Sequence, residues 1–479
     1  MGKPIEALLS GHVGLSAFHP LGNGLDAFVA RLAFTEFADK SIDVQYYLFH
    51  DDLSGRALAA YLLQAADRGV RVRLLLDDMD MNGRDEGLAA IDLHPNIEIR
   101  LFNPFPSRTL RHLNFITHFG TVTRRMHNKA FIVDNQVAIV GGRNIGDEYF
   151  EASEGTNFGD MDVLAIGPIV RDVSHSFDLY WNSNLAYPVA TLAAPGDPSL
   201  LERGRKALTQ EVAELANTAY GQRLRESNLA SSLAGKEVPL YWSASELLYD
   251  LPEKVRTDPS DRSTHLGPEL EELLATTQEQ LIAISPYFVP GKRGASELKK
   301  LAERGVEVTI ITNSLASTDV PAVHAGYVRY RRDLLSAGVK LFEMRPSRPP
   351  EETHDRRFGT SQSSLHAKTF VIDGRVVVVG SMNMDPRSNL LNTELGVVIA
   401  SPELAALLQD WRNNELHQEA WRVTLEGLEQ VPPSPEGTMQ WIASDSDKAA
   451  MIEEREPQAS FGRRLVVALL RWLPIEKQL

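Results

Sequence analysis

The sequence feature that most constrains the fold is a polar pattern, HxKxxxxDxxxxxxGxxN, which occurs once in each half of the chain. The first copy consists of His127, Lys129, Asp134, Gly141 and Asn144, and the second of His366, Lys368, Asp373, Gly380 and Asn383. One such pattern would arise by chance in on the order of one in several thousand chains of this length. Two copies in which every polar position survives indicate a duplicated unit with a shared chemical task, rather than a duplication kept only for packing.

The duplication extends beyond the two motifs. Residues 41–78 and 280–314 share an order of strand, loop, amphipathic helix, glycine turn and apolar strand, and residues 96–104 resemble 338–346. Strands that alternate with helices predict an α/β fold with a mainly parallel or mixed sheet. Because 479 residues exceed one ordinary core, we expect two halves. Their predicted bounds are 1–235 and 236–460, followed by a basic amphipathic helix in 461–479.

Each motif copy predicts a strand, a tight turn and a return strand. Asp134 and Asp373 stand directly before the turn dipeptides NQ and GR. Positions two apart on a strand share a face, so the His and Lys of each motif point the same way. The Asn follows a glycine turn, from which its amide can be aimed back at the same place. The side chains expected to converge are His127, Lys129, Asn144, His366, Lys368 and Asn383.

This combination of side chains suits a phosphate group. Lysine supplies positive charge, asparagine supplies hydrogen-bond donors, and histidine can act as nucleophile or proton carrier. Displacement at phosphorus through a covalent intermediate needs one histidine to attack and a second to protonate the leaving alcohol. The duplication therefore predicts two halves that face each other across a pseudo-two-fold axis, with a single active site at their interface.

Carboxylates are expected to support these groups. Asp162 and Glu394 each open an apolar strand, and a histidine base works better when a carboxylate orients it. We therefore expect the pairs His127–Asp162 and His366–Glu394. Asp134 and Asp373 are expected to hold the hairpins together rather than to react.

The double motif resembles that of the phospholipase D superfamily. The segments DVQYYLFHDDLSGR, RMHNKAFIVD, GGRNIGDEYF, NSLASTDVPAVHAGY and MDPRSNLLNTELG are similar to those of bacterial cardiolipin synthases, in particular the C type. The resemblance implies two phospholipase-D-like βαβ sandwich halves. It also implies transfer of a phosphatidyl group onto the hydroxyl of phosphatidylglycerol through a phosphohistidine, with phosphatidylglycerol or phosphatidylethanolamine as donor and with no metal.

One position departs from the family pattern. The family usually has serine after the motif glycine, as at Ser381, whereas the first copy has Gly142. The first half-site is therefore expected to lack a hydroxyl donor and to use a backbone N–H instead.

The motif alone leaves several functions open. A phosphatidyltransferase, a phospholipase D hydrolase and a nucleic-acid phosphodiesterase can share it, because acceptor and leaving group bind outside the motif. The formal net charge of −15 repels a polyanion, which disfavours nucleic acid as a partner and leaves phospholipids in a bilayer. A non-catalytic scaffold is disfavoured because His127 and His366 are both intact. We retain the transferase as the first hypothesis and the hydrolase as the second.

No cofactor or metal is expected. The chain has no cysteine, so thiolate metal sites are excluded. Residues 78–83 begin like a calcium loop, but Ala89 stands where the bidentate glutamate is required. His324 is expected to be an ordinary surface histidine. Tyr47 and Tyr287 end corresponding strands and are expected to pack, although they could line the site.

The expected location is the surface of a bacterial membrane, with the inner membrane as the first choice. No apolar run reaches the ~20 residues of a spanning helix, and the first residues do not resemble a secretory signal. Residues 461–473 form a predicted helix, capped by Ser460 and ended by Pro474, with three arginines and no acid. Such a helix can dock on the core or lie on a bilayer, and the sequence favours neither.

Overall fold

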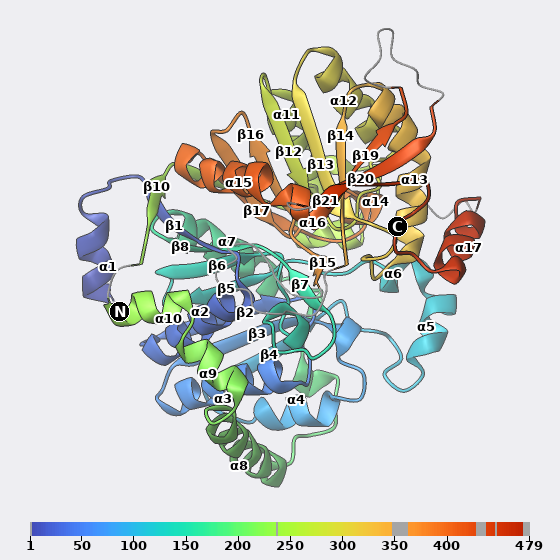
Figure 1. The fold of residues 1–479 in the computed structure, drawn as a ribbon. Coiled ribbons are helices and arrows are strands. Elements are labelled where there is room, and N and C mark those ends of the chain that lie inside the picture. The colour runs from blue at the N-terminus through green and yellow to red at the C-terminus, as the bar shows by residue number, and fades with distance from the viewer. Residues whose placement is uncertain (1, 236–237, 347–362, 428–436, 446–447, 473–479) are drawn as a thin grey trace.

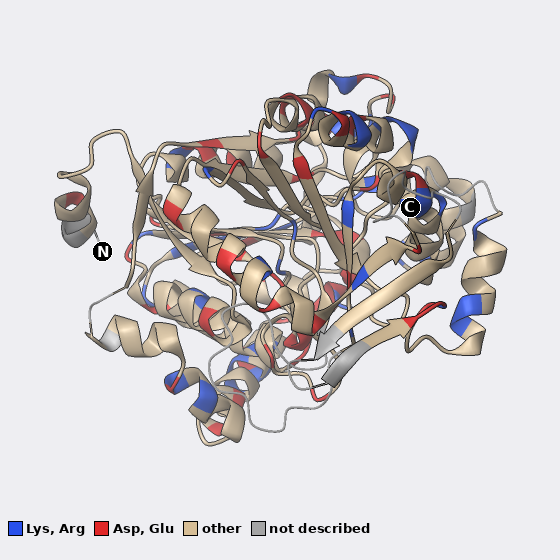
Figure 2. Cartoon of the chain, turned by 45° about the horizontal axis from the view of Figure 1, so that its top comes forward, with Lys and Arg blue, Asp and Glu red and all other residues tan. Residues whose placement is uncertain are grey.

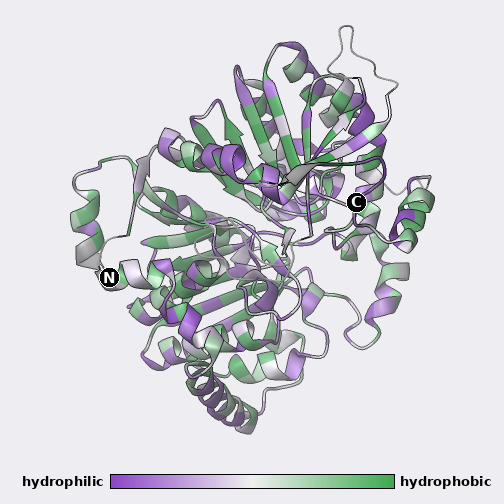
Figure 3. Ribbon diagram, in the orientation of Figure 1, coloured by the Kyte–Doolittle hydropathy of each residue, from purple (hydrophilic) through white to green (hydrophobic). Residues whose placement is uncertain are grey.

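The computed structural model describes residues 2–235, 238–346, 363–427, 437–445 and 448–472. It consists of two α/β halves, each built on one twisted sheet (Figure 1). Apolar residues concentrate on the strands of both sheets (Figure 3). The two-half α/β architecture predicted from the duplication is confirmed.

The first sheet has nine strands in the order β10-β1-β8-β6-β5-β2-β3-β4-β9. Its strands are β1 (Ser16–Leu21), β2 (Ser41–Tyr46), β3 (Arg71–Asp77), β4 (Ile97–Phe102), β5 (Ala130–Val133), β6 (Val137–Gly141), β8 (Asp162–Ile166), β9 (Ala186–Pro188) and β10 (Tyr241–Ser243).

The second sheet has ten strands in the order β11-β18-β17-β16-β12-β13-β14-β19-β20-β21. Its strands are β11 (Ser245–Tyr249), β12 (Gln280–Ile284), β13 (Glu307–Asn313), β14 (Lys340–Met344), β16 (Thr369–Ile372), β17 (Val376–Gly380), β18 (Leu395–Ile399), β19 (Ala420–Leu425), β20 (Met439–Asp445) and β21 (Lys448–Glu453). Within the second sheet, the neighbouring strands β11-β18-β17-β16-β12-β13-β14 correspond in order to β1-β8-β6-β5-β2-β3-β4 of the first sheet. The duplication is therefore visible in the topology.

Helices cover the sheets. Those before the second sheet are α1 (Gly2–Leu9), α2 (Gly24–Phe37), α3 (Leu53–Asp67), α4 (Asp85–Ile91), α5 (Arg111–Thr117), α6 (Phe119–Val122), α7 (Ile169–Trp181), α8 (Pro198–Leu215), α9 (Ala219–Arg225) and α10 (Asn228–Gly235). Those that follow are α11 (Gly267–Ala275), α12 (Gly291–Glu303), α13 (Pro321–Ser336), α14 (Pro386–Leu390), α15 (Pro402–Asn414), α16 (Leu416–Glu419) and α17 (Phe461–Leu470). Short 3₁₀ turns lie at 78–80, 147–149, 189–191, 252–255 and 262–264.

One hydrophobic core is shared between the halves. Ile132 and Val140 of the first sheet belong to the same buried cluster as Val371, Val379 and Val397 of the second. Each sheet has one further buried cluster on its outer face, beneath the helices that cover it. Burial of apolar surface between the sheets therefore fixes the halves against each other.

A small two-stranded sheet crosses the boundary between the halves. Strand β7 (Asn157–Gly159) pairs in parallel with β15 (Ser363–Leu365), which directly precedes the second histidine. The expected boundary at 235/236 needs correction, because β10 lies beyond it and still pairs with β1 of the first sheet. Sheet membership changes between β10 and β11.

The motif aspartates serve the hairpins, as expected. Asp134 adopts a positive φ of 55° in the β5–β6 turn and accepts hydrogen bonds from the backbone N–H groups of Asp39, Lys40 and Ser41. Asp373 repeats this in the second half, where it accepts from residues 278, 279 and 280. Each aspartate thus ties the hairpin turn to the start of the central strand.

The C-terminal helix begins where the sequence predicts. The Ser460 side chain accepts from the N–H of Arg463 at 3.2 Å, which is an N-cap. The predicted end at 473 and Pro474 lie outside the described residues. Within the described part of the chain, no helix combines the length and apolar character needed to span a membrane.

Candidate active site

Each motif histidine pairs with a carboxylate from the opposite half. Nδ1 of His127 lies 2.9 Å from Oε2 of Glu394, and Nδ1 of His366 lies 2.6 Å from Oδ2 of Asp160. The expected pairs His127–Asp162 and His366–Glu394 are therefore wrong. Both histidines nevertheless lie at the interface of the halves, and, in addition to burial, the lysine of each motif lowers the pKa of the histidine of the other motif, so the arrangement forms one site rather than two.

The register of the sheets explains the error. Gly141 of the first motif lies opposite Asp162, whereas Gly380 of the second lies opposite Gly396. Glu394 stands two residues before Gly396, so its structural counterpart is Asp160, two residues before Asp162. Sequence analysis missed Asp160 because it compared the first polar residues beside the two strands.

Asp162 has a different task. It is fully buried and accepts a hydrogen bond from Nη2 of Arg31 at 2.8 Å. Its other oxygen accepts from the N–H of Arg143 at 3.2 Å. Because an unpaired buried charge is costly, Asp162 holds two buried arginines beneath the site and does not orient a histidine.

Backbone hydrogen bonds fix the histidines from the opposite half as well. The N–H of His127 donates to the carbonyl of Thr393 at 2.8 Å, and the N–H of His366 donates to the carbonyl of Gly159 at 2.7 Å. Each histidine and its carboxylate are thus positioned by the same short segment of the other half. Their geometry cannot change unless the halves separate.

Glu394 is supported by Asp250 and Lys254, which the sequence analysis did not identify, and by Ser381, which it did. The N–H of Glu394 donates to Oδ2 of Asp250 at 2.7 Å, and Lys254 pairs with the same oxygen at 2.9 Å. The Ser381 hydroxyl donates to the Glu394 carboxylate in a short hydrogen bond. Asp250 belongs to no recognisable sequence motif, so only its contact with Glu394 in the folded structure reveals its role.

The space beside Asp160 explains the departure at Gly142. A Cβ atom at position 142 would lie 2.2 Å from Oδ1 of Asp160. The structure agrees with the expectation that a backbone N–H takes the place of the missing hydroxyl, although the donor is not Gly142, whose N–H donates to the carbonyl of Met161 at 3.1 Å. Asp160 instead accepts from the N–H of Met161 at 2.7 Å. The two half-sites thus hold their carboxylates by different donors.

Burial disfavours the charged form of both imidazoles. It lowers the pKa of His127 to about 4, although Glu394 acts in the opposite direction. Burial also lowers the pKa of His366, and Lys368 adds to this effect. With Nδ1–H donated to the carboxylate, Nε2 of a neutral ring carries a free electron pair, which suits a nucleophile or a base, whereas Nε2 of a protonated ring can donate a proton as a general acid.

The motif lysines lie beside the histidines. Nζ of Lys129 donates to the carbonyl of His127 at 2.6 Å, and Nζ of Lys368 donates to the carbonyl of His366 and lies 2.8 Å from its Nδ1. Burial lowers the pKa of Lys129 well below its usual value and that of Lys368 to about 8. An anion bound between them would favour their charged forms.

The motif asparagines differ in their contacts. Asn144 donates to the Tyr149 hydroxyl at 2.8 Å and accepts from the N–H of Leu48 at 3.2 Å. The side-chain oxygen of Asn383 is buried and has no hydrogen-bond partner among the described residues. The side-chain oxygen of Asn383 can therefore accept a hydrogen bond from a ligand, whereas that of Asn144 already accepts one from Leu48.

Aromatic rings enclose both histidines. Tyr47 packs edge-on against His127 with ring centroids 5.0 Å apart, and Tyr287 approaches His366 at 6.4 Å. Tyr149 and Phe158 contact His366 at 5.3 and 5.1 Å. The two strand-end tyrosines thus belong to the lining of the site, beyond the packing role expected for them.

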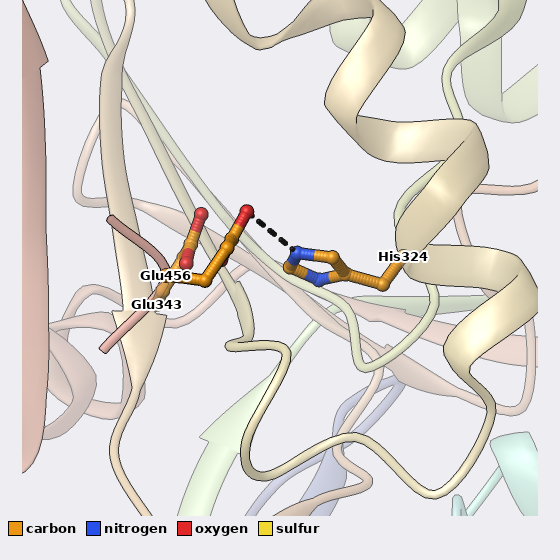
Figure 4. A group of neighbouring side chains, drawn as sticks. All are labelled: His324, Glu343 and Glu456. Atoms are coloured by element: carbon orange, nitrogen blue, oxygen red, sulfur yellow. Dashed lines mark hydrogen bonds and ion pairs between the residues drawn. The ribbon is translucent and has the colours of Figure 1, made fainter. Parts of the chain in front are cut away.

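A cluster of possible metal ligands lies in the second half, outside this site. His324, Glu343 and Glu456 approach one another closely (Figure 4). However, Nη1 of Arg331 pairs with Glu456 at 2.8 Å and its Nη2 lies 3.1 Å from Glu343. The guanidinium already supplies the positive charge, so the cluster does not fit a cation. The expectation of a surface position for His324 is also wrong, because its side chain is buried in this cluster.

Basic and acidic residues are distributed over both halves (Figure 2). The net charge of −15 is therefore a property of the whole surface and not of one tail. The basic groups of the site, Lys129 and Lys368, are buried between the halves and do not belong to this surface.

Comparisons with known proteins show the family to which the chain belongs. A family model described as cardiolipin synthase, PLD-like domain, matches residues 34–181 and 270–415. The chain is 42% identical to cardiolipin synthase C of Escherichia coli over 99% of both chains, and 26% identical to a cardiolipin synthase of Oceanobacillus iheyensis, covering 85% of this chain and 70% of the relative. Among solved structures, phosphatidylserine synthase of Haemophilus influenzae matches with a TM-score of 0.59 at 15% identity, covering 91% of this chain and 95% of that structure.

Proposed function

We infer that this chain, which belongs to the cardiolipin synthase family of the phospholipase D superfamily, is a phosphatidyltransferase that makes cardiolipin from two phospholipids. The observation that carries this inference is the pair of cross-half contacts, His127–Glu394 and His366–Asp160, with two buried lysines beside them. Such a site can bind a phosphodiester, form a bond to its phosphorus and transfer a proton on either side of it.

In the first step, Nε2 of one histidine attacks the phosphorus of the donor phospholipid. A phosphorus–nitrogen bond forms, the bond to the headgroup oxygen breaks, and the second histidine protonates that oxygen. The headgroup leaves as glycerol from phosphatidylglycerol or as ethanolamine from phosphatidylethanolamine. In the second step, the same second histidine removes the proton from a hydroxyl of phosphatidylglycerol, whose oxygen attacks phosphorus and releases the first histidine.

We assign the nucleophile to His127 and the proton transfer to His366. The His366–Asp160 contact of 2.6 Å is shorter than the His127–Glu394 contact of 2.9 Å. Short hydrogen bonds of this kind are typical of charge-assisted pairs, which favour the imidazolium needed in a general acid. The lysines and the side-chain N–H groups of Asn383 would donate to the phosphate oxygens, where negative charge develops in the transition state.

The phospholipid substrates place the enzyme on a bacterial membrane, and α17 supplies a contact with the bilayer. One face of α17 docks on the protein, where Val467 is buried and Arg463 donates to the carbonyls of residues 315, 316 and 318. The opposite face exposes an apolar stripe, which consists of Phe461, Leu465, Leu469 and Trp472. Docking and bilayer binding are thus compatible, because they use different faces of the same helix.

Hydrolysis is the second candidate function, because water could accept the phosphatidyl group in place of a lipid hydroxyl. The motif residues serve both reactions equally well. Similarity to cardiolipin synthase C over nearly the whole chain favours transfer.

Mixed vesicles of phosphatidylglycerol and phosphatidylethanolamine test the proposal. The purified full chain is incubated with them in EDTA, and the products are resolved by mass spectrometry. Cardiolipin with released glycerol or ethanolamine is the expected result, and a His127→Ala/His366→Ala variant provides the blank. Phosphatidic acid without cardiolipin would instead identify a hydrolase.

A further inference from the structure

Helix α5 exposes apolar side chains and buries polar ones, which is the reverse of an ordinary surface helix. An ordinary surface helix buries its apolar side chains and exposes its polar ones. In α5 the polar residues Arg111 and Asn114 are buried, whereas Leu113 is 51% exposed. Leu110, directly before the helix, is 59% exposed, and Phe119 at the start of α6 is 48% exposed. A row of large apolar side chains therefore points into solvent.

The buried polar side of α5 shows that this orientation is built into the fold. Arg111 pairs with Asp78 at 2.6 Å, and its guanidinium lies 4.6 Å from the ring centre of Phe105. Asn114 donates to the carbonyl of Ser107 at 3.0 Å and accepts from its N–H at 3.2 Å. Rotation of α5 to bury Leu113 would break all of these contacts.

The sequence segment that contains α5 is also unusual for this protein in its lack of acidic residues. Residues 99–133 contain no Asp or Glu, although the chain as a whole carries 64 acidic residues. The exposed titratable groups of α5 and the turn after it are His112 and His118. No carboxylate of this segment would repel an anionic surface.

The position of α5 connects it with the lipid reaction. The segment continues through α6 directly into Arg125, Met126 and His127. In Figure 1, α5 and α6 project from the same edge of the molecule as α17. The exposed stripe of α17 is also apolar and is accompanied by arginines but no acid.

We propose that residues 107–122 form a second membrane contact, in which Leu110, Leu113 and Phe119 enter the interfacial layer of an anionic bilayer next to the first catalytic histidine. This inference rests on the proposed function, since it takes the substrate to be a lipid in that bilayer. Shallow insertion of exposed apolar side chains from an acid-free segment is the physics of interfacial helices. Together with α17, it would fix the orientation of the enzyme so that the site faces the lipid headgroups.

Site-specific labelling tests the contact directly. The chain has no cysteine, so Leu113→Cys introduces a single thiol for an environment-sensitive fluorophore. Phe37→Cys is the matched control, because Phe37 is 57% exposed at the end of α2, in a different region. Phe119→Cys is a second test site if the Leu113 variant does not fold. Each labelled full chain is mixed with phosphatidylglycerol vesicles, with and without lipids brominated on the acyl chain.

The proposal predicts a blue shift and bromolipid quenching for the label at position 113 and neither for the label at position 37. A label at 113 that remains in water while the protein co-sediments with vesicles would overturn it. A blue shift that appears without vesicles and grows with protein concentration would also overturn it, in favour of contact between two copies. Cardiolipin formation is measured in the same samples, so a failure of the proposed function appears separately from a failure of the membrane contact.

Discussion

Nδ1 of His127 lies 2.9 Å from Oε2 of Glu394, a carboxylate 267 residues further along the chain and in the opposite half of the molecule. The reciprocal contact, His366 with Asp160, spans 206 residues in the other direction. Each half therefore contributes a histidine to one pair and an acid to the other. Neither half contains a complete histidine–carboxylate pair, so we expect activity to require both copies of the motif.

Removal of the cross-half carboxylates should impair catalysis without unfolding the protein. Glu394→Gln and Asp160→Asn leave the side-chain volume nearly unchanged but remove the charge that stabilises the imidazolium. We expect turnover to fall by ~10²–10⁴-fold, measured as cardiolipin formed per enzyme.

Asp162→Asn is the matched control for this experiment. It leaves both histidine pairs intact but weakens the buried contact with Arg31. We therefore expect the free energy of unfolding to decrease by no more than about 5 kcal/mol. The folded protein should retain near-normal turnover. A Tm measured alongside activity separates the two effects. Catalytic loss in Asp162→Asn equal to that in Asp160→Asn would contradict the observed pairing.

The two positions after the motif glycines should respond differently to exchange. In Gly142→Ser the added Cβ would collide with Asp160, since it would lie 2.2 Å from Oδ1. We expect this variant to displace the carboxylate from His366 and to lose at least ~10²-fold in turnover, a typical general acid–base contribution. Ser381→Gly removes only one donor to Glu394, worth about 1.5–3 kcal/mol for a hydrogen bond to a charged group. Equal tolerance of both substitutions would show that the half-sites are interchangeable.

Anion binding should weaken in alkaline solution because of Lys368. Burial lowers the pKa of this lysine to about 8, so its charge is lost as the pH rises through that value. A bound anion favours the charged form, and its affinity must therefore decrease above about pH 8. Tungstate binding, followed by calorimetry from pH 7 to 10, provides the measurement.

Lys368→Arg keeps its charge throughout this range. We expect the alkaline loss of tungstate affinity to disappear in this variant. Lys206→Arg, at an exposed position on α8, should retain the behaviour of the unmodified protein. An alkaline loss that persists in Lys368→Arg would assign the titration to another group.

The exposed stripe of α17 should contribute to vesicle binding. Leu469→Glu places a carboxylate in an apolar face that is 63% exposed at this position, next to an anionic surface. The lost burial and the added repulsion, at roughly 1 kcal/mol per charge, should weaken co-sedimentation with phosphatidylglycerol vesicles by about tenfold. Hydrolysis of a short-chain, water-soluble phosphodiester should not change.

Phe37→Glu serves as the comparison for Leu469→Glu, since it introduces the same charge at a similarly exposed aromatic residue on α2. Its vesicle binding should be close to that of the unmodified chain. If both variants bind equally well, α17 is a docked structural helix and nothing more.

The sequence allowed prediction of local structure and of which residues gather in the site. The alternation of His127 and Lys129 along a strand, and the hairpin role of Asp134 and Asp373, depend on short-range geometry that spacing reveals. The partners of the histidines depend on packing between the halves, which spacing does not encode. Asp162 is the predicted histidine partner because it starts a strand, whereas the observed partner, Asp160, lies in the segment before that strand.

Two further features could be recognised only from three-dimensional contacts. Asp250 reaches Glu394 across 144 residues and belongs to no motif. The orientation of α5 depends on the ion pair between Arg111 and Asp78, which turns the helix so that Leu113 faces outward. A sequence signal for this region did exist, namely the absence of any acidic residue from 99 to 133.

The most direct test of the single composite site uses a phosphodiester with a nitrophenolate leaving group, which departs without protonation. His366→Ala should release one equivalent of nitrophenolate in a burst and then stall, because no base remains to activate the acceptor. Quenching in alkaline denaturant, which preserves the acid-labile phosphorus–nitrogen bond, should leave an adduct on His127. His127→Ala should show neither burst nor adduct. An adduct on His366 would exchange the two roles, whereas half of the normal turnover in each single variant would show two independent sites and contradict the composite site itself.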